Sequence, residues 1–154
     1  MKYPKRARLK EFDYCGSFAY FITVGTCQKN PYFRDQHASD IVIPILQEVA
    51  SRFKFALIAY CFMPDHLHLL LVGDETSSLK SFVKIFKQRS GFCFRRQFNI
   101  PLWQPSYYDH VLRREESLKK VARYILENPV RKGLVTDFKE YPFLGSMVFD
   151  LSEL

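Results

Sequence analysis

The sequence predicts an α+β fold of the ferredoxin-like (split βαβ) kind, with an antiparallel sheet that carries helices on one face and leaves the other exposed. Three observations predict it. Short runs rich in aromatic and β-branched residues indicate four strands. Two segments with apolar residues at helical spacing indicate helices, and the order along the chain is β, α, β, β, α, β. An additional helix follows the last strand.

The elements expected in the first half are bounded by polar or turn-forming residues. Pro44 falls within the first helix, which tolerates a proline only in its first turn or two. The turn Met63-Pro64-Asp65 joins two strands into a hairpin. In order, we expect a basic N-terminal arm over residues 1–15, a strand over 18–25, a helix over 39–52, and strands over 55–62 and 66–73.

In the second half, Ser77 or Ser78 can cap a basic amphipathic helix that runs to about residue 94. A strand over 107–112 and a helix over 115–128 follow, and Pro129 helps to end that helix. We expect the tail over 136–154 to pack as a loop without a further element. No linker divides the chain, so a single domain over 1–154 is expected.

Composition narrows the class of protein. No apolar run approaches the roughly 20 residues that cross a bilayer, and no signal-type stretch follows the N-terminus, so a cytoplasmic protein without membrane association is expected. The four cysteines form no CxxC pair, which argues against a disulfide scaffold and a zinc finger. A net charge of +7 attracts polyanions and makes nucleic acid the leading partner class.

A histidine pair follows the Met63-Pro64-Asp65 turn. His66 and His68 alternate with leucines, and because side chains alternate across a strand, both imidazoles project from one face. Two neutral imidazoles on one strand can hold a divalent metal and leave positions for water or substrate. Two alternatives stay open: the histidines only form hydrogen bonds, or Cys61 joins them in a zinc site.

A helix near the C-terminus offers a complementary pair. Tyr124 and Asn128 are four residues apart, so both emerge from one helix face. The amide oxygen of Asn128 is a hard neutral ligand that would complete a three-ligand site for Mg²⁺ or Mn²⁺. A phenol is a poor nucleophile at neutral pH, but a metal that polarises a phosphate makes attack by Tyr124 easier. A packing role for this tyrosine is the alternative.

Four ordered blocks give the chain a recognisable pattern. They are Phe21-Ile22-Thr23, residues 63–70, Trp103-Gln104 with residues 108–113, and residues 124–135. With these blocks the chain resembles the single-tyrosine HUH transposases, over about residues 8–145. It is most similar to the REP-associated tyrosine transposases, relatives of the small insertion-sequence transposases.

The resemblance implies cleavage and joining of single-stranded DNA next to hairpin or palindromic, REP-like sequences. Tyr124, on the C-terminal helix, would attack a phosphate and form a 5′-phosphotyrosine intermediate. His66 and His68 would be the HUH metal pair for Mg or Mn, with Asn128 at the third-ligand position. The family includes monomers and homodimers, so both stay open, and its members act in the nucleoid of a prokaryotic cell.

Basic and aromatic side chains elsewhere supply a candidate DNA-binding surface. Lysine and arginine contact phosphates, and aromatic rings stack on unpaired bases. A solvated basic face is the alternative for each residue. The candidates are Arg6, Arg8, Lys10, Lys84, Lys87, Arg89, Arg95, Arg96, Trp103, Tyr107, Tyr108, His110 and Arg113.

Two other functions stay open. A non-catalytic single-stranded nucleic-acid-binding module of the same fold would stack bases on exposed strand aromatics, although the chain has no Gly-Phe-aromatic strand of RNP type. A phosphodiesterase fits less well, because the chain offers one His-x-His pair instead of two His-x-Thr/Ser motifs.

Overall fold

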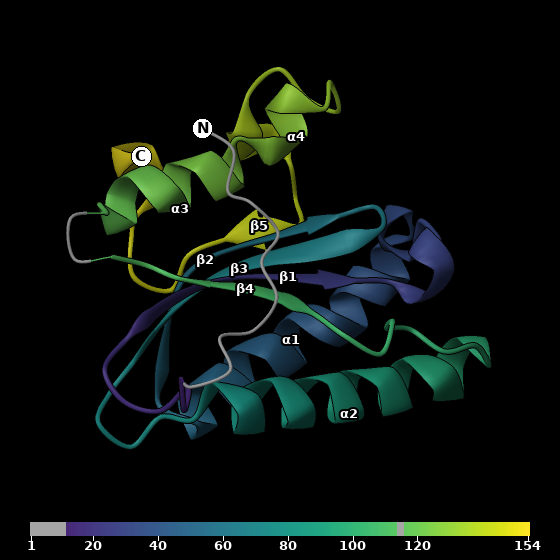
Figure 1. Ribbon diagram of the computed structural model, residues 1–154. Helices are drawn as coiled ribbons and strands as arrows, with labels where there is room; N and C mark the ends of the chain where they lie inside the picture. The colour runs from purple at the N-terminus through teal and green to yellow at the C-terminus, as the bar shows by residue number, and fades with distance from the viewer. Residues whose placement is uncertain (1–11, 114–115) are drawn as a thin grey trace.

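The computed structural model describes residues 12–113 and 116–154 and contains a five-stranded antiparallel sheet (Figure 1). The strand order is β4-β1-β3-β2-β5, so β3 lies in the middle. The predicted α+β class and antiparallel sheet are confirmed. The strands are β1 (Ala19–Gly25), β2 (Phe55–Met63), β3 (His66–Gly73), β4 (Tyr108–Val111) and β5 (Leu144–Gly145).

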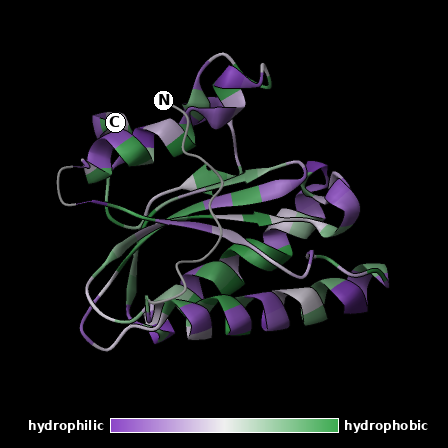
Figure 2. Cartoon of the chain, in the orientation of Figure 1, coloured by the Kyte–Doolittle hydropathy of each residue, from purple (hydrophilic) through white to green (hydrophobic). Residues whose placement is uncertain are grey.

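Helices lie on both faces of the sheet (Figure 1). α1 (Gln36–Arg52) and α2 (Leu79–Phe98) cover one face, while α3 (Leu118–Leu126) and the short α4 (Asn128–Arg131) lie over the other. Figure 2 shows hydrophobic and hydrophilic bands alternating around α2, as an amphipathic helix requires. None of the helices in the described part of the chain is long and apolar enough to cross a membrane.

The face that was expected to be exposed is covered in part by α3, which corrects the predicted arrangement. Val121, Ala122 and Ile125 of α3 are buried, and they share an apolar cluster with Phe21 and Leu70 of the sheet. Removing this apolar stripe from water holds the helix on the sheet. α3 therefore brings its other side chains up to the edge of the histidine face.

The register of β1 and β3 decides which side chains face α3. Thr23 lies opposite His68, and Gly25 lies opposite His66. Residues directly opposite each other in an antiparallel ladder share a face, so all four face the same side. The predicted alternation is confirmed, because the leucines between and after the histidines are fully buried in the core beneath α1 and α2: Leu67, Leu69 and Leu71.

The first helix starts earlier than expected. Asp35 caps α1 by accepting a hydrogen bond from the backbone N–H of His37, so the helix begins at Gln36. Pro44 consequently lies in the third turn, beyond the position at which a proline was expected to be tolerated. Packing of α1 against α2 and the sheet outweighs the one backbone hydrogen bond that the proline removes.

The boundaries of α2 and α3 also differ from expectation. α2 extends to Phe98, where Asn99 adopts the left-handed conformation that commonly ends a helix. α3 ends at Leu126, and α4 begins at Asn128. Pro129 thus lies in the first turn of a new helix, where its missing N–H would be unpaired anyway, instead of only ending the previous one.

The C-terminal tail is not a plain loop, contrary to expectation. It contains β5 and two 3-10 helices, Phe138–Glu140 and Leu151–Glu153. The Tyr141 hydroxyl donates to the carbonyl oxygen of Phe62 at 2.5 Å, and the Phe62 N–H donates to the carbonyl oxygen of Phe143 at 2.8 Å. These long-range bonds occupy the outer edge of β2.

Two residues of the predicted basic arm belong to the apolar core: Tyr14 lies in it and Phe12 packs against it, while Asp13 and Cys15 are exposed. Tyr14 is fully buried, and its ring stacks on that of Tyr20 at a centroid distance of 6.2 Å. The N–H of Leu79 donates to the carbonyl oxygen of Tyr14 at 2.9 Å, which ties this segment to α2. The arm candidates Arg6, Arg8 and Lys10 lie outside the described residues.

Candidate active site

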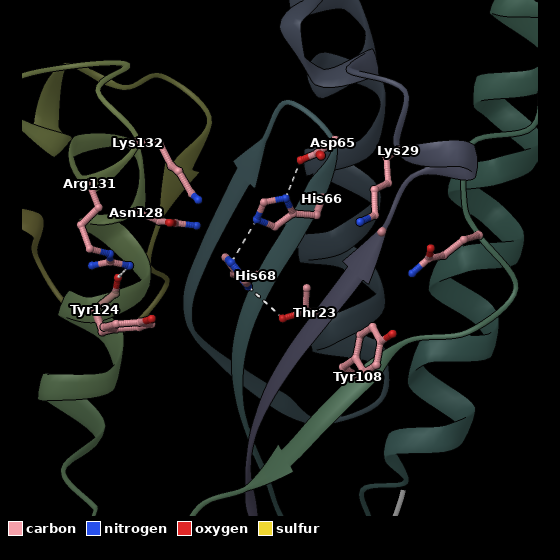
Figure 3. A pocket seen from close by; sticks show the side chains of 12 residues that line it. Thr23, Lys29, Asp65, His66, His68, Tyr108, Tyr124, Asn128, Arg131 and Lys132 are labelled. Atoms are coloured by element: carbon pink, nitrogen blue, oxygen red, sulfur yellow. Dashed lines mark hydrogen bonds and ion pairs between the residues drawn. The ribbon is translucent and has the colours of Figure 1, made fainter. Parts of the chain in front are cut away.

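The two histidines of β3 direct their Nε2 atoms toward each other (Figure 3), at a distance of 3.1 Å. His66 Nδ1 is hydrogen-bonded to Asp65 Oδ1 at 2.6 Å, and His68 Nδ1 to Thr23 Oγ1 at 2.9 Å. A carboxylate only accepts hydrogen bonds, so the proton on His66 is at Nδ1. The Nε2 lone pair of His66 then faces His68, where it can accept a hydrogen bond from His68 Nε2 or bind a metal.

This arrangement fits a divalent metal. Two imidazole nitrogens that bind one ion at about 2.1 Å, with a right angle between them, are about 3 Å apart. The observed Nε2 separation of 3.1 Å agrees with that value. Within the described ranges, no three side chains of His, Cys, Asp or Glu gather into a metal site, so further ligands would come from an amide, water or phosphate.

The structure disfavours the zinc alternative that includes Cys61. Cys61 lies opposite His68 in the pairing of β2 with β3, and it is fully buried in the apolar cluster beneath α3. Burial raises the pKa of this thiol. Cys61 is also absent from the residues that line the cavity around the histidines, and within residues 12–113 and 116–154 it forms no three-ligand group with them.

Tyr124 of α3 and Asn128 of α4 share a cavity of about 680 Å³ with both histidines. Figure 3 shows Tyr124 and Asn128 on the helix side of this cavity and the histidines on the strand side. Asn128 is buried, with 6% of its surface exposed. The four residues singled out from two separate sequence patterns thus meet within one chain.

Arg131 holds the Tyr124 ring from the end of α4. Its guanidinium carbon lies 4.0 Å from the centroid of the tyrosine ring, and Nη2 donates to the Tyr124 carbonyl oxygen at 2.6 Å. A cation over the face of an aromatic ring is attracted to it. Phe21 of β1 packs on the same ring at a centroid distance of 6.3 Å. Together these contacts restrict the orientation of the tyrosine.

Besides Thr23 and Asp65, which hold the histidines, four polar residues of the cavity were not expected as site residues from the sequence: Lys29, Gln104, Arg131 and Lys132. Gly25 makes room for one of them, because a Cβ at this position would lie 2.6 Å from Nε2 of Gln104. Gln104, Arg131 and Lys132 belong to the blocks that carry the family resemblance, so that signal could have found them. Lys29 lies in a polar loop with no periodic pattern.

Two predicted DNA-binding residues make contacts within the protein. Lys87 Nζ donates to the carbonyl oxygens of Gln104 and Ser106, at 2.7 and 3.4 Å. Arg89 forms a two-pronged ion pair with Glu48, at 3.1 and 2.8 Å, and holds the pKa of that carboxyl below its usual range. Lys87 therefore supports the loop that carries Gln104, and Arg89 connects α2 to α1.

Trp103 and His110 also have internal partners. Trp103 is half-buried, its Nε1 donates to Ser90 Oγ at 2.8 Å, and its ring lies 5.6 Å from that of Phe33. These contacts favour a packing role over base stacking. His110 Nε2 lies 3.1 Å from Glu116 Oε1, and its side chain is 13% exposed.

The remaining described DNA-binding candidates differ in how exposed they are and in which cavity they line. Tyr108 lines the cavity that holds the histidines and Tyr124, which we call the central cavity, beside Thr23. Lys84 and Arg95 line a separate cavity, of about 340 Å³, along α2. Tyr107 is half-buried, and four candidates are exposed: Lys84, Arg95, Arg96 and Arg113. DNA binding by these residues stays a prediction.

Fold and site together define a tyrosine transposase: an antiparallel sheet presents a histidine pair to a tyrosine on a separate helix. The chain belongs to the family described as Transposase IS200 like, whose sequence model matches residues 16–128. The matched segment contains both histidines, Tyr124 and Asn128.

Similar proteins with known names support this family assignment. A putative REP-associated tyrosine transposase of Haemophilus influenzae is 24% identical over 145 residues, covering 85% of this chain and 81% of that protein. The REP-associated tyrosine transposase of Escherichia coli is 28% identical over 92 residues, covering 58% and 53%. A solved REP-associated tyrosine transposase bound to a REP hairpin superposes with a TM-score of 0.72 at 20% identity, covering 90% and 82%. The resemblance drawn from the four blocks is confirmed.

Proposed function

We propose that this protein is a metal-dependent single-stranded DNA endonuclease and strand transferase with Tyr124 as its nucleophile. One observation carries the proposal: Tyr124 shares a cavity with the facing Nε2 atoms of His66 and His68. A nucleophile beside a pair of metal ligands is what attack on a phosphodiester requires, because the negatively charged phosphate must be neutralised before an oxygen approaches it.

In the proposed reaction, the Tyr124 hydroxyl attacks a phosphodiester phosphorus. A bond forms between the tyrosine oxygen and phosphorus, and the bond from phosphorus to the 3′ oxygen breaks. The phenol proton is released to water, and the leaving 3′ oxygen takes up a proton from water. The products are a 5′-phosphotyrosine and a free 3′ hydroxyl. Because one ester replaces another, a second 3′ hydroxyl can reverse the step without ATP.

The surrounding residues have distinct proposed parts in this reaction. His66 and His68 would hold Mg²⁺ or Mn²⁺, and Asn128 is the candidate third ligand, because its buried amide lines the same cavity. The metal would supply charge neutralisation at the phosphate. Asp65 and Thr23 orient the two imidazoles, and Arg131 orients the tyrosine ring.

The proposed substrate is a single strand next to a foldback hairpin. Two relatives are named REP-associated tyrosine transposases, and the solved one is bound to a REP hairpin. The net charge of +7 supports a polyanionic partner. We also propose that one chain completes the site, because Tyr124 and the histidine pair line the same cavity without a partner subunit.

A covalent-adduct assay tests the nucleophile. The protein is incubated with Mn²⁺ and a labelled oligonucleotide that carries a hairpin, and we expect a DNA adduct that survives denaturation. Tyr124→Phe should abolish the adduct. Tyr108→Phe is the matched control, because Tyr108 lines the same cavity, and it should retain the adduct. An adduct that persists in Tyr124→Phe would contradict the assignment.

Two further arms separate the alternatives. A non-catalytic binding module would bind the oligonucleotide equally well with EDTA and would form no adduct with any divalent ion. Mixing Tyr124→Phe with His66→Ala protein tests the single-chain site. We expect no adduct from the mixture, whereas restored adduct formation would show a homodimer that exchanges its tyrosines.

A further inference from the structure

A second cavity adjoins the candidate active site beside the turn between β2 and β3. Its volume is about 470 Å³, and we call it the side cavity. It shares four lining residues with the central cavity: Lys29, Asp65, His66 and Lys132. A polymer bound at the histidine pair would therefore continue into the side cavity.

The side cavity carries a surplus of positive charge. Three of its lining residues are cations: Lys29, Arg34 and Lys132. Asp65 is the acidic residue in this lining. The Asp65 carboxylate is already hydrogen-bonded to His66. Within residues 12–113 and 116–154, the side chains of the three cations have no hydrogen bond or ion pair. Arg89, by contrast, is paired with a carboxylate.

The turn that carries Lys29 is strained and firmly held. Gln28 and Lys29 have φ values of 54° and 55°, a left-handed conformation in which a Cβ is unfavourable. Thr26 fixes the turn, because its N–H donates to the carbonyl oxygen of Asp65 at 3.0 Å and its hydroxyl lies within hydrogen-bond distance of the carbonyl oxygens of Asn30 and Asp65, at 2.8 and 3.0 Å. Strained backbone of this kind persists where neighbouring contacts enforce it, and it clusters at binding sites.

The hydrogen bonds of Thr26 also relate Lys29 to the histidine pair. Asp65 directly precedes His66, so the bonds from Thr26 connect the Lys29 turn to the start of β3. Lys132 follows α4 on the other side. Figure 3 shows Lys29 and Lys132 on opposite sides of His66. The two ammonium groups thus flank the strand end that carries the histidines.

We propose that Lys29, Arg34 and Lys132 form a subsite for the sugar-phosphate backbone of the DNA strand, next to the phosphate that Tyr124 attacks. This inference rests on the proposed function. Cations without protein partners in a groove suit consecutive phosphates, which carry a fixed negative charge and are the same in every sequence. The subsite holds the strand in register for attack and does not read its bases.

Salt dependence of binding tests the subsite without any knowledge of the target sequence. The probe is an oligothymidylate long enough to cross both cavities, bound to the full chain in EDTA. In the variant, Lys29, Arg34 and Lys132 are all changed to glutamine. The matched control changes Lys119, Lys120 and Lys139 to glutamine, which removes the same charge from exposed residues that line none of the three cavities.

The slope of log affinity against log salt concentration is the measured quantity. Each lost phosphate contact lowers its magnitude by about 0.7 for single strands, so the subsite variant should lose about two. Affinity at low salt should fall at least tenfold in that variant, while the control keeps its slope. Equal losses in both variants would overturn the subsite and indicate a general effect of net charge. Thermal unfolding verifies that both variants fold.

Neutral methylphosphonates locate the contact on a hairpin-tailed oligonucleotide. Replacing one phosphate at a time should weaken binding of the wild type at positions flanking the cleaved phosphate, and the subsite variant should lose nothing further there. The same penalty in both proteins would contradict the proposal. Adduct formation with Mn²⁺ is followed in parallel. A wild type that forms no adduct but shows the expected slopes would refute the proposed reaction and leave the backbone subsite standing.

Discussion

The two halves of the candidate active site are built differently. The histidine half lies on β3, which is hydrogen-bonded to β1 on one side and β2 on the other. Each imidazole is also held by a neighbour, His66 by Asp65 and His68 by Thr23. The tyrosine half lies on α3, a helix of nine residues that packs on the sheet through one apolar stripe.

This difference separates a rigid histidine half from a tyrosine half whose position depends on packing. A central strand can move only if two ladders of hydrogen bonds break, whereas a short helix undocks when its apolar contacts are lost. We therefore expect changes in the histidine half to alter metal binding and chemistry. Changes in the tyrosine half should alter the delivery of the nucleophile and leave metal binding intact.

The largest effect should come from His68→Ala, which removes one of the two facing nitrogens. Adduct formation should fall about a thousandfold, because charge neutralisation by a metal contributes several kcal/mol to phosphoryl transfer. Isothermal titration with Mn²⁺ and single-turnover kinetics measure the loss. His37→Ala is the control, because the His37 side chain is 81% exposed on α1. Wild-type Mn²⁺ affinity in His68→Ala would contradict a metal-binding role for the histidine half.

Ile125→Ala should loosen the tyrosine half alone. Ile125 is fully buried between α3 and the sheet, and truncating such a side chain costs about 3 kcal/mol. Hydrogen exchange should then show roughly a hundredfold less protection in α3, with β3 unchanged and Mn²⁺ affinity retained. Equal loss of protection in β3 would show that the two halves unfold as one unit.

Asp65→Asn should affect the histidine half indirectly, through the hydrogen bond that His66 Nδ1 donates to Asp65. The amide no longer provides a charged acceptor for His66 Nδ1, and losing such a support typically lowers metal affinity by about 10–100-fold. Mn²⁺ titration measures the effect, and Asp40→Asn on the exposed face of α1 is the isosteric control. Unchanged affinity would mean that the sheet alone orients the imidazole.

Arg131→Leu should give the smallest effect, on the rate of adduct formation. Losing a cation over an aromatic ring costs about 1 kcal/mol, or roughly fivefold to tenfold in rate. We expect Arg131→Lys to restore part of it, since a cation remains, and Mn²⁺ affinity to be unaffected. Arg52→Leu at the exposed end of α1 is the control. A change in Mn²⁺ affinity, with the rate of adduct formation unaltered, would assign Arg131 to the histidine half.

Several features of the fold and site were predictable because they follow from local geometry. The alternation of His66 and His68 with leucines fixes their shared face whatever the strand pairs with. The spacing of Tyr124 and Asn128 likewise places them on one side of a helical segment, even though α3 ends between them. Helix ends were less predictable. α1 begins at Gln36, which places Pro44 in its third turn, and the packing of this helix decided that the proline was tolerated there.

The partners of individual side chains within the fold were not predictable in the same way. Lys87 and Trp103 have the chemistry of DNA contacts, but their partners in the fold are backbone carbonyls and Ser90. β5 likewise forms only because the edge of β2 is available to pair with it. In each case the deciding partner lies many residues away, and a local pattern carries no information about it.

The sequence by itself determined the strand and helix periodicities, the shared face of the histidines, the basic character of the chain and its resemblance to a family. Only the tertiary structure decided that α3 covers part of the histidine face and that Tyr124 lies under Arg131. It alone brought Lys29 and Lys132 together beside His66. The physical reason is that periodicity reflects backbone geometry, which repeats every few residues, whereas these meetings are set by burial and hydrogen bonding between segments far apart in the chain.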